Sequence, residues 1–410
     1  MKNTQTKNDN KEILFLLTQD LESPSGLGRY FPISKYLAKQ GFSVNIAALH
    51  SNYSSLKTHT LVKEGVNVHY VSQMHIKKEN NQTIYFNSLQ LFWHVIKATW
   101  LLFLFILKNP PDIIVIGKPH PMNSVAGILG GYLKNSKIIL DCDDFEAASN
   151  YFSSKWQQNI VKFFENTTPR FAHKITTNTL FNKERMIALG ISADKIHYLP
   201  NGVDPDRFKK IDKNKIDEIV YRLNLSNKRI IAYIGSLNLS NHPVDLLINA
   251  FKLVSKIHEN TALIIVGAGK DLEKLKEQSI DLNVKDKVFF EGRVDPEMVV
   301  NYYKLADVTV DPVYDTEAAK GRCPLKMFES WLSGTPFITS DVGDRKILSG
   351  DPPAALLTLP GDASDLANII KKIINDQDLA LELRINSLKI VEYFYWENLV
   401  QEKFQPLFAK

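Results

Sequence analysis

The chain has few of the residues that crosslink small secreted domains or build cysteine metal sites. Among its 410 residues only Cys142 and Cys323 are cysteines, and neither belongs to a C-x-x-C pair or has a neighbouring histidine pattern. This argues against a disulfide framework and against a zinc site, and it predicts a reducing, cytoplasmic location. With 44% hydrophobic and 23% charged residues, the composition is that of a globular protein.

A strong excess of one charge is also missing. The formal net charge is +5, which is too mild for a dedicated nucleic-acid binder, although it suits anionic substrates or an anionic membrane surface. The first eleven residues are polar and lack the apolar stretch of a signal peptide. They therefore predict a disordered lead-in to the first strand and a protein that is not secreted.

One segment, 91–107, raises the question of a membrane. It is an apolar helix by pattern, but His94 and Lys97 lie inside it, which argues against a transmembrane span. The favoured interpretation is a helix buried against its own sheet. The alternative is a peripheral membrane contact in which Trp93, Trp100 and the phenylalanines enter the interface.

Short β-rich runs alternate twice with helical patterns, which predicts an α/β protein with two parallel, doubly wound Rossmann-like sheets covered on both faces. Two such domains would face each other across a shared cleft. The expected strands are 12–18, 43–49, 67–71, 112–116, 137–141, 173–177 and 195–199 in the first half, and 229–235, 262–267, 287–290, 307–311, 335–339 and 354–358 in the second.

The same pattern sets the expected domain boundaries. We predict a first domain at 12–200, an interdomain linker at 201–228, a second domain at 229–375 and a helical tail at 376–410. Periodicity does not decide which domain the tail packs on.

Ligands of open parallel sheets bind outside the carboxyl ends of the strands. After the first strand, Gly26 and Gly28 form a turn that either brings backbone amides close to an anion or is a tight turn and nothing more. A dinucleotide fingerprint fails there, because Phe31 holds the third glycine position, and it fails again after Gly267, where Leu272 holds it. A nicotinamide cofactor is therefore disfavoured.

The segment from Ala318 to Pro336 is the richest in candidate binding residues. Pro324 and Gly334 predict a helix from about 324 to 333. Lys326 in its first turn opposes the helix dipole, and an anion such as a diphosphate would explain that cation, assisted by Arg322.

Glu329 follows Lys326 on the same helix face, where its carboxylate can accept hydrogen bonds from ribose hydroxyls. The alternative is a simple Lys326–Glu329 ion pair on the surface.

In this segment the run PLKMFESWLSGTPFITSDVG resembles the nucleotide-binding segment of the retaining GT-B glycosyltransferases of family 4. Further pieces agree in order along nearly the whole chain: the glycine turn with Arg29, PNGVD at 200–204 with Phe208, YIGSL, LIIVGAG, VFFEGRV and LADVTVDP.

The resemblance implies that the domain at 12–200 binds the acceptor and that the domain at 229–375 binds the nucleotide sugar. It also implies residue roles. Glu329 would bind the ribose, and the amides near Pro324, Leu325 and Lys326 would hold the diphosphate. The remaining positions are Gly235 and Ser236 close to the phosphates, Arg293 and Val294 beside the base, and Gly26, Gly28, Arg29 and Gly321 along the donor sugar or phosphate.

The chain also departs from the family pattern. Gly321 stands where the first, sugar-contacting glutamate is usual, and Glu317 is too early to be assumed its substitute. Ser236 and His242 stand where the family usually has basic residues, so Arg322 and Lys326 are expected to supply the missing charge.

Acidic residues end an internal strand of the first domain. Asp141 and Asp143 form a D-x-D pattern, but we expect no metal there. Instead Asp144 and His120, after neighbouring strands, are candidates to orient sugar hydroxyls or to receive an acceptor proton. For both, an ordinary loop position is the alternative.

The sequence thus predicts a retaining glycosyltransferase that needs no cofactor and no metal. It would move a sugar from a UDP- or GDP-sugar to a lipid-linked or polysaccharide glycan acceptor, with Asp144, His120, Lys326 and Arg322 as catalytic candidates. The alternatives are a nucleotide-sugar epimerase and a non-catalytic sugar-nucleotide-binding protein.

Overall fold

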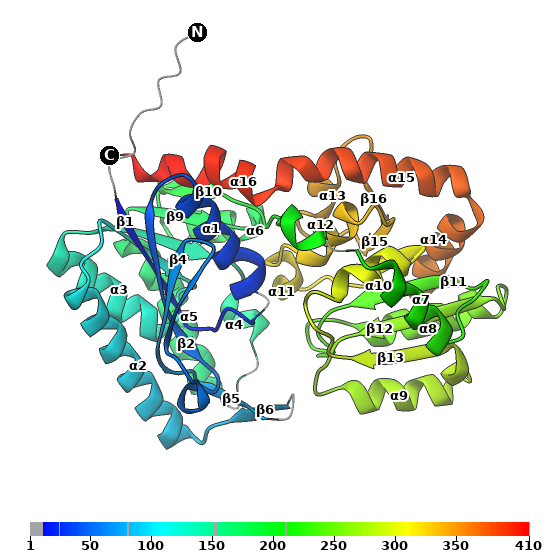
Figure 1. The fold of residues 1–410 in the computed structure, drawn as a ribbon, viewed down its shortest axis with the longest axis horizontal. Coiled ribbons are helices and arrows are strands. Elements are labelled where there is room, and N and C mark those ends of the chain that lie inside the picture. Colours follow the sequence, from blue (N-terminus) through cyan, green and yellow to red (C-terminus); the bar gives the residue numbers. More distant parts are fainter. Residues whose placement is uncertain are drawn as a thin grey trace, which may run out of the picture. The chain divides into compact units, whose positions relative to one another are not determined.

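The structure is a computed structural model. It describes residues 11–23, 25–79, 82–150, 152, 154–209 and 211–409. The chain forms two compact units: unit 1 comprises Met1–Asn201 with Trp396–Lys410, and unit 2 comprises Gly202–Tyr395 (Figure 1). The expected disordered lead-in lies almost wholly outside the described residues.

Unit 1 is built on an eight-stranded sheet in the order β10-β9-β8-β7-β1-β2-β4-β3. Its central strands are continuous apolar runs buried on both faces, which is typical of parallel sheets in α/β proteins. The strands are β1 Glu12–Leu17, β2 Ser43–His50, β3 Thr60–Lys63, β4 Val66–Gln73, β7 Ile113–Gly117, β8 Lys137–Cys142, β9 Lys174–Thr177 and β10 Ile196–Tyr198.

The prediction of a wholly parallel first sheet is wrong at one edge. β3 pairs with β4 in antiparallel fashion, and a separate hairpin follows, formed by β5 (Ile76–Glu79) and β6 (Gln82–Tyr85). The sequence pattern missed these three strands because none of them carries the continuous apolar run by which the other strands were found, and β3 is exposed throughout.

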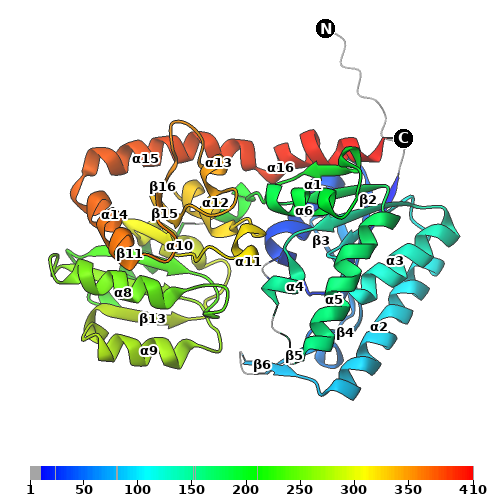
Figure 2. The ribbon, with the colours of Figure 1, turned by 180° about the vertical axis from the view of Figure 1, so that it is seen from behind.

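Helices cover both faces of this sheet (Figures 1 and 2). The core on one face includes side chains from α1 and from the last residues of the chain, and the core on the other includes side chains from α2 and α3. The helices of unit 1 are α1 Phe31–Lys39, α2 Ser88–Lys108, α3 Pro121–Lys134, α4 Glu146–Ser149, α5 Lys155–Thr167, α6 Leu180–Ala188 and α16 Trp396–Leu399.

α2 contains the apolar segment 91–107. Only a narrow stripe of it, Ala98, Leu102 and Ile106, is buried in the core. Trp93 is 61% exposed and Trp100 57%. The favoured prediction of a helix buried against its own sheet is therefore right for one side of α2 and wrong for the other, because a helix packed on a single layer buries only one face.

Unit 2 is built on a six-stranded parallel sheet in the order β13-β12-β11-β14-β15-β16, as predicted. Its strands are β11 Arg229–Ile234, β12 Thr261–Val266, β13 Val288–Gly292, β14 Val308–Asp311, β15 Phe337–Ser340 and β16 Ala355–Thr358. Its helices are α7 Lys213–Arg222, α8 Val244–Ser255, α9 Leu272–Asp281, α10 Val299–Leu305, α11 Glu317–Lys320, α12 Leu325–Leu332, α13 Arg345–Ser349, α14 Ala363–Asn375 and α15 Gln377–Ile390.

Two boundaries differ from the expected ones. The segment 201–228 is not a free linker, because α7 places Ile219, and the following turn places Leu225, in the core of unit 2. The tail at 376–410 is divided: α15 belongs to unit 2, whereas the chain from Trp396 onward belongs to unit 1. A polar composition suggested a connection at 201–228, but the few apolar residues of α7 are enough to pack one face.

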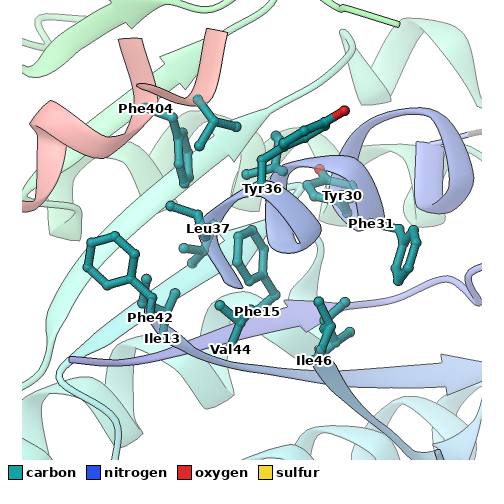
Figure 3. Packing of buried hydrophobic residues seen from close by; sticks show 14 of the residues in the cluster. Ile13, Phe15, Tyr30, Phe31, Tyr36, Leu37, Phe42, Val44, Ile46 and Phe404 are labelled. Carbon is teal, nitrogen blue, oxygen red and sulfur yellow. The ribbon is translucent and has the colours of Figure 1, made fainter. Parts of the chain in front are cut away.

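The last residues complete the first core (Figure 3). Phe404 is fully buried, with its ring centroid 6.3 Å from that of Phe15 and 5.6 Å from that of Phe408. Phe408 in turn meets Phe42 edge-on at 5.4 Å. Residues from opposite ends of the chain therefore depend on each other for burial.

We expect Phe404→Ala to lower the free energy of unfolding of unit 1 by about 3–5 kcal/mol, because it leaves a cavity among aromatic rings. Urea unfolding followed by circular dichroism measures the change. Phe163→Ala, which shortens a 59% exposed ring of α5, is the matched control and should cost less than about 1 kcal/mol. Equal losses in the two variants would contradict this account of the core.

Candidate functional site

The richest candidate segment of the sequence forms α12 in unit 2. Pro324 lies just before the helix in an extended conformation, so the helix begins one residue later than predicted. Leu325 is its first residue, and Gly334 follows its carboxyl end with φ of +67°. The first amides of a helix lack partners within it, and this start is where the resemblance places the diphosphate.

Lys326 turns toward the carboxyl end of β14. Its Nζ lies 3.0 Å from Oδ1 of Asp311 and 4.1 Å from the centroid of the Tyr233 ring. Arg345 approaches the other carboxylate oxygen at 3.5 Å. Burial alone would raise the pKa of Asp311, but the charges of Lys326, Arg345 and Arg322 outweigh it and lower that pKa well below its usual range. Asp311 is therefore a permanent anion.

Arg322 adds a third cation to this group. Its Nη1 donates to the carbonyl oxygen of Asn241 at 2.8 Å. Its Nε and Nη2 are buried and have no hydrogen-bond partner among the described residues, and the Nζ of Lys326 likewise has only its ion pair. Three cations around one carboxylate leave an excess of positive charge and unsatisfied donors, which an anion would satisfy.

Gly235 lies directly beside this charge. A Cβ atom at that position would be 2.8 Å from Nζ of Lys326, so only a glycine lets the ammonium lie this close to the backbone. Ser236 is exposed, and its carbonyl oxygen accepts a hydrogen bond from the Tyr233 hydroxyl at 2.8 Å. The structure thus brings Gly235 and Ser236 to the end of β11, close to Lys326.

His242, which stands where the family usually has a lysine, supplies no charge. Burial lowers its pKa well below the usual range, and the neighbouring Arg322 and Lys326 lower it further. The imidazole is neutral at physiological pH, so the positive charge around Asp311 comes from Arg322, Lys326 and Arg345. The phosphate-binding role expected of Arg322 and Lys326 stays a prediction.

Glu329 lies one turn further along α12 and faces other partners. The Tyr303 hydroxyl donates to its Oε2 at 2.9 Å, and Nη1 of Arg207 lies 3.5 Å from its Oε1. The alternative of a Lys326–Glu329 ion pair is not what the structure shows, since Lys326 pairs with Asp311. The Glu329 side chain is 16% exposed, which leaves part of the carboxylate accessible to a ligand.

The remaining candidates of unit 2 are at loops or helix ends. Arg293 is exposed and Val294 is partly buried after β13, where Gly292 has φ of +68°. Gly321 is buried and ends α11. Glu317 begins α11 and is exposed. The roles predicted for Arg293, Val294 and Gly321 stay predictions.

In unit 1 the prediction that Arg29 lines the donor is wrong. The side chain is fully buried, and Nε and Nη2 bind the two carboxylate oxygens of Asp141 at 2.8 and 2.7 Å. Nη1 donates to Oδ1 of Asn201 at 2.8 Å, and the guanidinium lies 5.6 Å from the centre of the Trp396 ring. Such a fork-to-fork pair uses the donors within the fold and anchors the glycine turn.

The glycines of that turn are explained by packing. Gly26 and Gly28 lie in a π-helical segment, η1 Gly26–Tyr30, that leads into α1. A Cβ atom on Gly26 would come within 2.2 Å of the carbonyl oxygen of Asp20. The carbonyl oxygen of Gly28 accepts a hydrogen bond from the Trp396 indole at 2.8 Å. The tight-turn interpretation therefore accounts for Gly26 without a ligand.

A second charged group lies at the ends of β7 and β8. Nζ of Lys118 lies 2.7 Å from Glu146, 3.0 Å from Asp144 and 3.5 Å from Asp143. His120 precedes α3, and its Nε2 lies 3.2 Å from Oε2 of Glu146. The structure thus brings the candidates Asp144 and His120 together through partners that the sequence analysis did not name.

One lysine faces three carboxylates here, so the acids compete for its charge. Lys118 and His120 lower the pKa of Glu146 against the effect of its burial. Burial, together with repulsion from Asp143 and Glu146, raises the pKa of Asp144 to about 7 despite the contact with Lys118. A carboxyl group poised near neutral pH is suited to proton transfer.

Sequence reasoning missed the supporting residues: Lys118, Glu146, Arg207, Tyr303, Asp311 and Arg345. Lys118 and Asp311 had a usable signal, because each follows or ends an apolar strand where ligands bind. Lys118 also has φ of +69°, an unusual conformation for a lysine. No sequence signal pointed to Arg207 or Tyr303, since they contact Glu329 only in the folded chain.

The described residues contain no group of three or more His, Cys, Asp or Glu side chains placed to hold a metal ion. Within the D-x-D pattern, Asp141 is occupied by Arg29 and Asp143 accepts from Asn178 Nδ2 at 3.3 Å. The expectation of a metal-free, cofactor-free reaction stays a prediction.

Two family models match this chain. Residues 31–207 match Glycosyltransferase Family 4, and residues 215–389 match the Glycosyl transferases group 1. Together the two models cover most of the chain, and they support a group 1 glycosyltransferase. The resemblance proposed from the motifs is therefore confirmed.

Individual relatives are distant. An uncharacterized glycosyltransferase of Methanocaldococcus jannaschii is 25% identical over 234 residues, which are 56% of this chain and 57% of that protein. A GDP-mannose-dependent alpha-(1-6)-phosphatidylinositol monomannoside mannosyltransferase of Mycobacterium tuberculosis is 25% identical over 211 residues, 51% of this chain and 54% of that protein. The chain thus spans about half the length of the curated relatives it matches.

Solved structures extend the likeness to the whole fold. The crystal structure of HepE from Anabaena in complex with UDP-glucose has a TM-score of 0.73 at 19% identity and covers 97% of this chain and 99% of that one. At this identity the likeness shows the fold, which is the GT-B fold of two Rossmann-like α/β domains with a helical C-terminal segment. The predicted fold class is confirmed.

The raised pKa of Asp144 predicts a pH-dependent stability. From the ordinary aspartate pKa of about 4 up to about 7, the folded state keeps a proton on Asp144 that the unfolded state has lost, so the contribution of Asp144 to stability falls as the pH rises. We expect Asp144→Asn to gain stability relative to wild type across this window and to level off above it. Urea unfolding between pH 4 and 8 measures this, with Asp341→Asn, at an exposed position, as the control. A pH-independent difference would contradict the raised pKa.

Proposed function

We propose that the protein is a glycosyltransferase that binds a nucleoside-diphosphate sugar in unit 2 and a glycan acceptor in unit 1. The observation that carries this proposal is the excess positive charge at the start of α12. Arg322 and Lys326 offer buried donors, Lys326 lies against Gly235, and one carboxylate, Asp311, offsets only part of the charge. The match to the group 1 family model supports the same interpretation.

The diphosphate is the ligand that this charge fits best. When the sugar is transferred, the bond between its anomeric carbon and the phosphate oxygen breaks, and negative charge develops on the leaving diphosphate. Fixed cations at that place stabilise the transition state more than the ground state. Lys326 and Arg322 would bind the diphosphate in this way, with the first amides of α12.

The nucleoside would bind beside the diphosphate through Glu329. An ionised carboxylate can accept hydrogen bonds from two ribose hydroxyls, and Tyr303 and Arg207 hold it in place. We assign Tyr303 and Arg207 as positioning residues for Glu329, since they act through its carboxylate. Arg293 and Val294 would border the base. UDP and GDP remain the proposed nucleotides, because the HepE structure contains UDP-glucose and the mannosyltransferase relative is named as GDP-mannose-dependent.

The acceptor would bind at the carboxyl edge of the first sheet. Asp144 and His120 lie there with a carboxyl group whose pKa is near neutral, suited to orient a sugar hydroxyl. We propose that transfer retains the anomeric configuration. The acceptor oxygen forms the new bond to the anomeric carbon, and its proton passes to the leaving phosphate oxygen on the same face. Asp144 is the alternative acceptor of that proton.

The acceptor class is proposed as a lipid-linked or polysaccharide glycan, and the location as cytoplasmic. The mannosyltransferase relative, named for a phosphatidylinositol mannoside, supports the lipid-linked choice. Position 321 has a glycine instead of the usual sugar-contacting glutamate. A second candidate function is therefore a non-catalytic sugar-nucleotide-binding protein. Donor hydrolysis or transfer distinguishes the two, since only an enzyme releases free nucleoside diphosphate.

The decisive experiment is a panel of UDP-, GDP- and ADP-sugars, with thermal shift and slow donor hydrolysis as measurements. We expect one nucleotide class to stabilise the protein. Lys326→Ala and Glu329→Ala should each weaken its binding about tenfold or more, because each removes a charged hydrogen-bonding group. Glu317→Ala is the control and should bind as the wild type does, because Glu317 is exposed.

If no sugar nucleotide stabilises the protein, the proposed function fails. Loss of binding in Glu317→Ala alone would move the site to α11. Melting temperatures of the ligand-free variants show whether Lys326→Ala acts through binding or through the loss of a partner for Asp311.

The positioning role of Tyr303 has its own test. Tyr303→Phe removes the hydroxyl that donates to Glu329, and we expect about threefold to tenfold weaker nucleotide binding. The loss should disappear with a 2′,3′-dideoxy nucleotide, which has no ribose hydroxyls for Glu329 to bind. Tyr302→Phe, which loses a hydrogen bond to Glu291 instead, is the matched control. An equal loss with the dideoxy nucleotide would show that Tyr303 has only a structural role.

A further inference from the structure

The exposed side of α2 continues onto two neighbouring helices. α2 contacts α3, and α3 contacts α5 (Figure 2). All three present large apolar side chains to solvent. We call these residues the apolar face: Leu89, Phe92, Trp93, Ile96, Trp100, Leu129, Tyr132, Leu133, Trp156, Ile160 and Phe163.

The apolar face follows helical periodicity on α2. Leu89, Trp93, Ile96 and Trp100 recur at intervals of three and four residues, so they form one stripe. This stripe is opposite the buried Ala98, which packs into the core of unit 1 with the rest of its row. α2 is therefore apolar on two opposite sides, and the core accounts for only one of them. A soluble monomer rarely leaves so many large apolar side chains together in water.

The exposed charged side chains of these three helices have a single sign. The three helices carry five exposed lysines: Lys97, Lys108, Lys134, Lys155 and Lys162. Their only acidic residue is Glu165, which is buried. On α2, Lys97 and Lys108 share one line along the edge of the apolar stripe. Lysines can extend their ammonium groups to phosphate headgroups while tryptophan and tyrosine occupy the boundary region.

We propose that the apolar face is a peripheral docking surface for a lipid bilayer that contains anionic lipids. The tryptophans and aliphatic side chains enter the interface, and the lysines bind the headgroups. This inference concerns unit 1 alone and does not depend on the nucleotide site of unit 2. It extends the membrane contact expected for 91–107 to three helices and gives it a charge requirement.

Other occupants fit the observations less well. A second copy of the chain would bring its own lysines against these lysines, and like charges in an isologous contact repel. α2 is long and apolar enough to span a bilayer by length and composition. A span, however, would withdraw Leu102 and Ile106 from the core and place Lys97 in hydrocarbon. A helix lying in the interface leaves Leu102 and Ile106 in the core and keeps Lys97 out of the hydrocarbon.

The test is flotation of the full chain with vesicles of phosphatidylcholine alone or mixed with phosphatidylglycerol. We expect binding to the mixed vesicles at low salt, release at high salt, and little binding to phosphatidylcholine alone. Trp93→Ser with Trp100→Ser should reduce partitioning about tenfold or more. Lys97→Gln and Lys108→Gln should each reduce it about fivefold.

Tyr221→Ser is the matched control, because Tyr221 is an 89% exposed aromatic residue of unit 2. It should bind vesicles as the wild type does. Brominated lipids should quench the fluorescence of Trp93, Trp100 and Trp156, since the other two tryptophans, Trp331 and Trp396, are fully buried. The double tryptophan variant should keep its thermal stabilisation by sugar nucleotides, which separates this inference from the proposed function.

Four outcomes would overturn the proposal. These are no binding to mixed vesicles, equal binding with and without phosphatidylglycerol, unchanged binding of the tryptophan variant, and binding that resists sodium carbonate, as a transmembrane span would. A lipid-free dimer in sedimentation that the tryptophan variant abolishes would instead identify the apolar face as a contact between copies of the chain.

Discussion

The carboxylate of Asp311 organises the candidate donor site. It is buried at the end of β14, where an unpaired charge would be costly, so the fold must bring cations to it. Lys326 from α12 and Arg345 from α13 meet this need. Because Arg322 joins the group without an acid of its own, the compensation of one buried anion leaves a surplus of positive charge at the same place.

In unit 1, buried carboxylates are also paired with cations, but there the negative charges outnumber the positive ones. Asp141 at the end of β8 binds Arg29, whose Nε also lies 3.8 Å from Asp143, and Arg29 ties the glycine turn to Asn201. Beside it, Lys118 faces three carboxylates, so negative charge is in surplus and one acid keeps its proton close to neutral pH. One unit thus offers donors to an anion, and the other offers acceptors to hydroxyl groups.

Much of this architecture follows from local sequence. The thirteen expected strands all form, because continuous apolar runs between turn residues have few alternatives to a buried parallel strand. The helix start at Pro324 and its end at Gly334 follow from turn chemistry. The weakly apolar β3 and the hairpin β5–β6 escaped prediction. So did the packing of α7, since its core contribution rests on a few residues in a polar stretch.

By itself, the sequence determined the family, the two α/β sheets, and the cluster of Arg322, Lys326 and Glu329 on one short segment, because motifs and periodicity are local. Only the tertiary structure decided what each charge meets. Arg29, predicted to contact the donor, is buried and pairs with Asp141. Glu329 contacts Tyr303 and Arg207, and one side of α2 is exposed to solvent. These outcomes depend on residues distant in the chain, and pairing across such distances is not encoded in any local pattern.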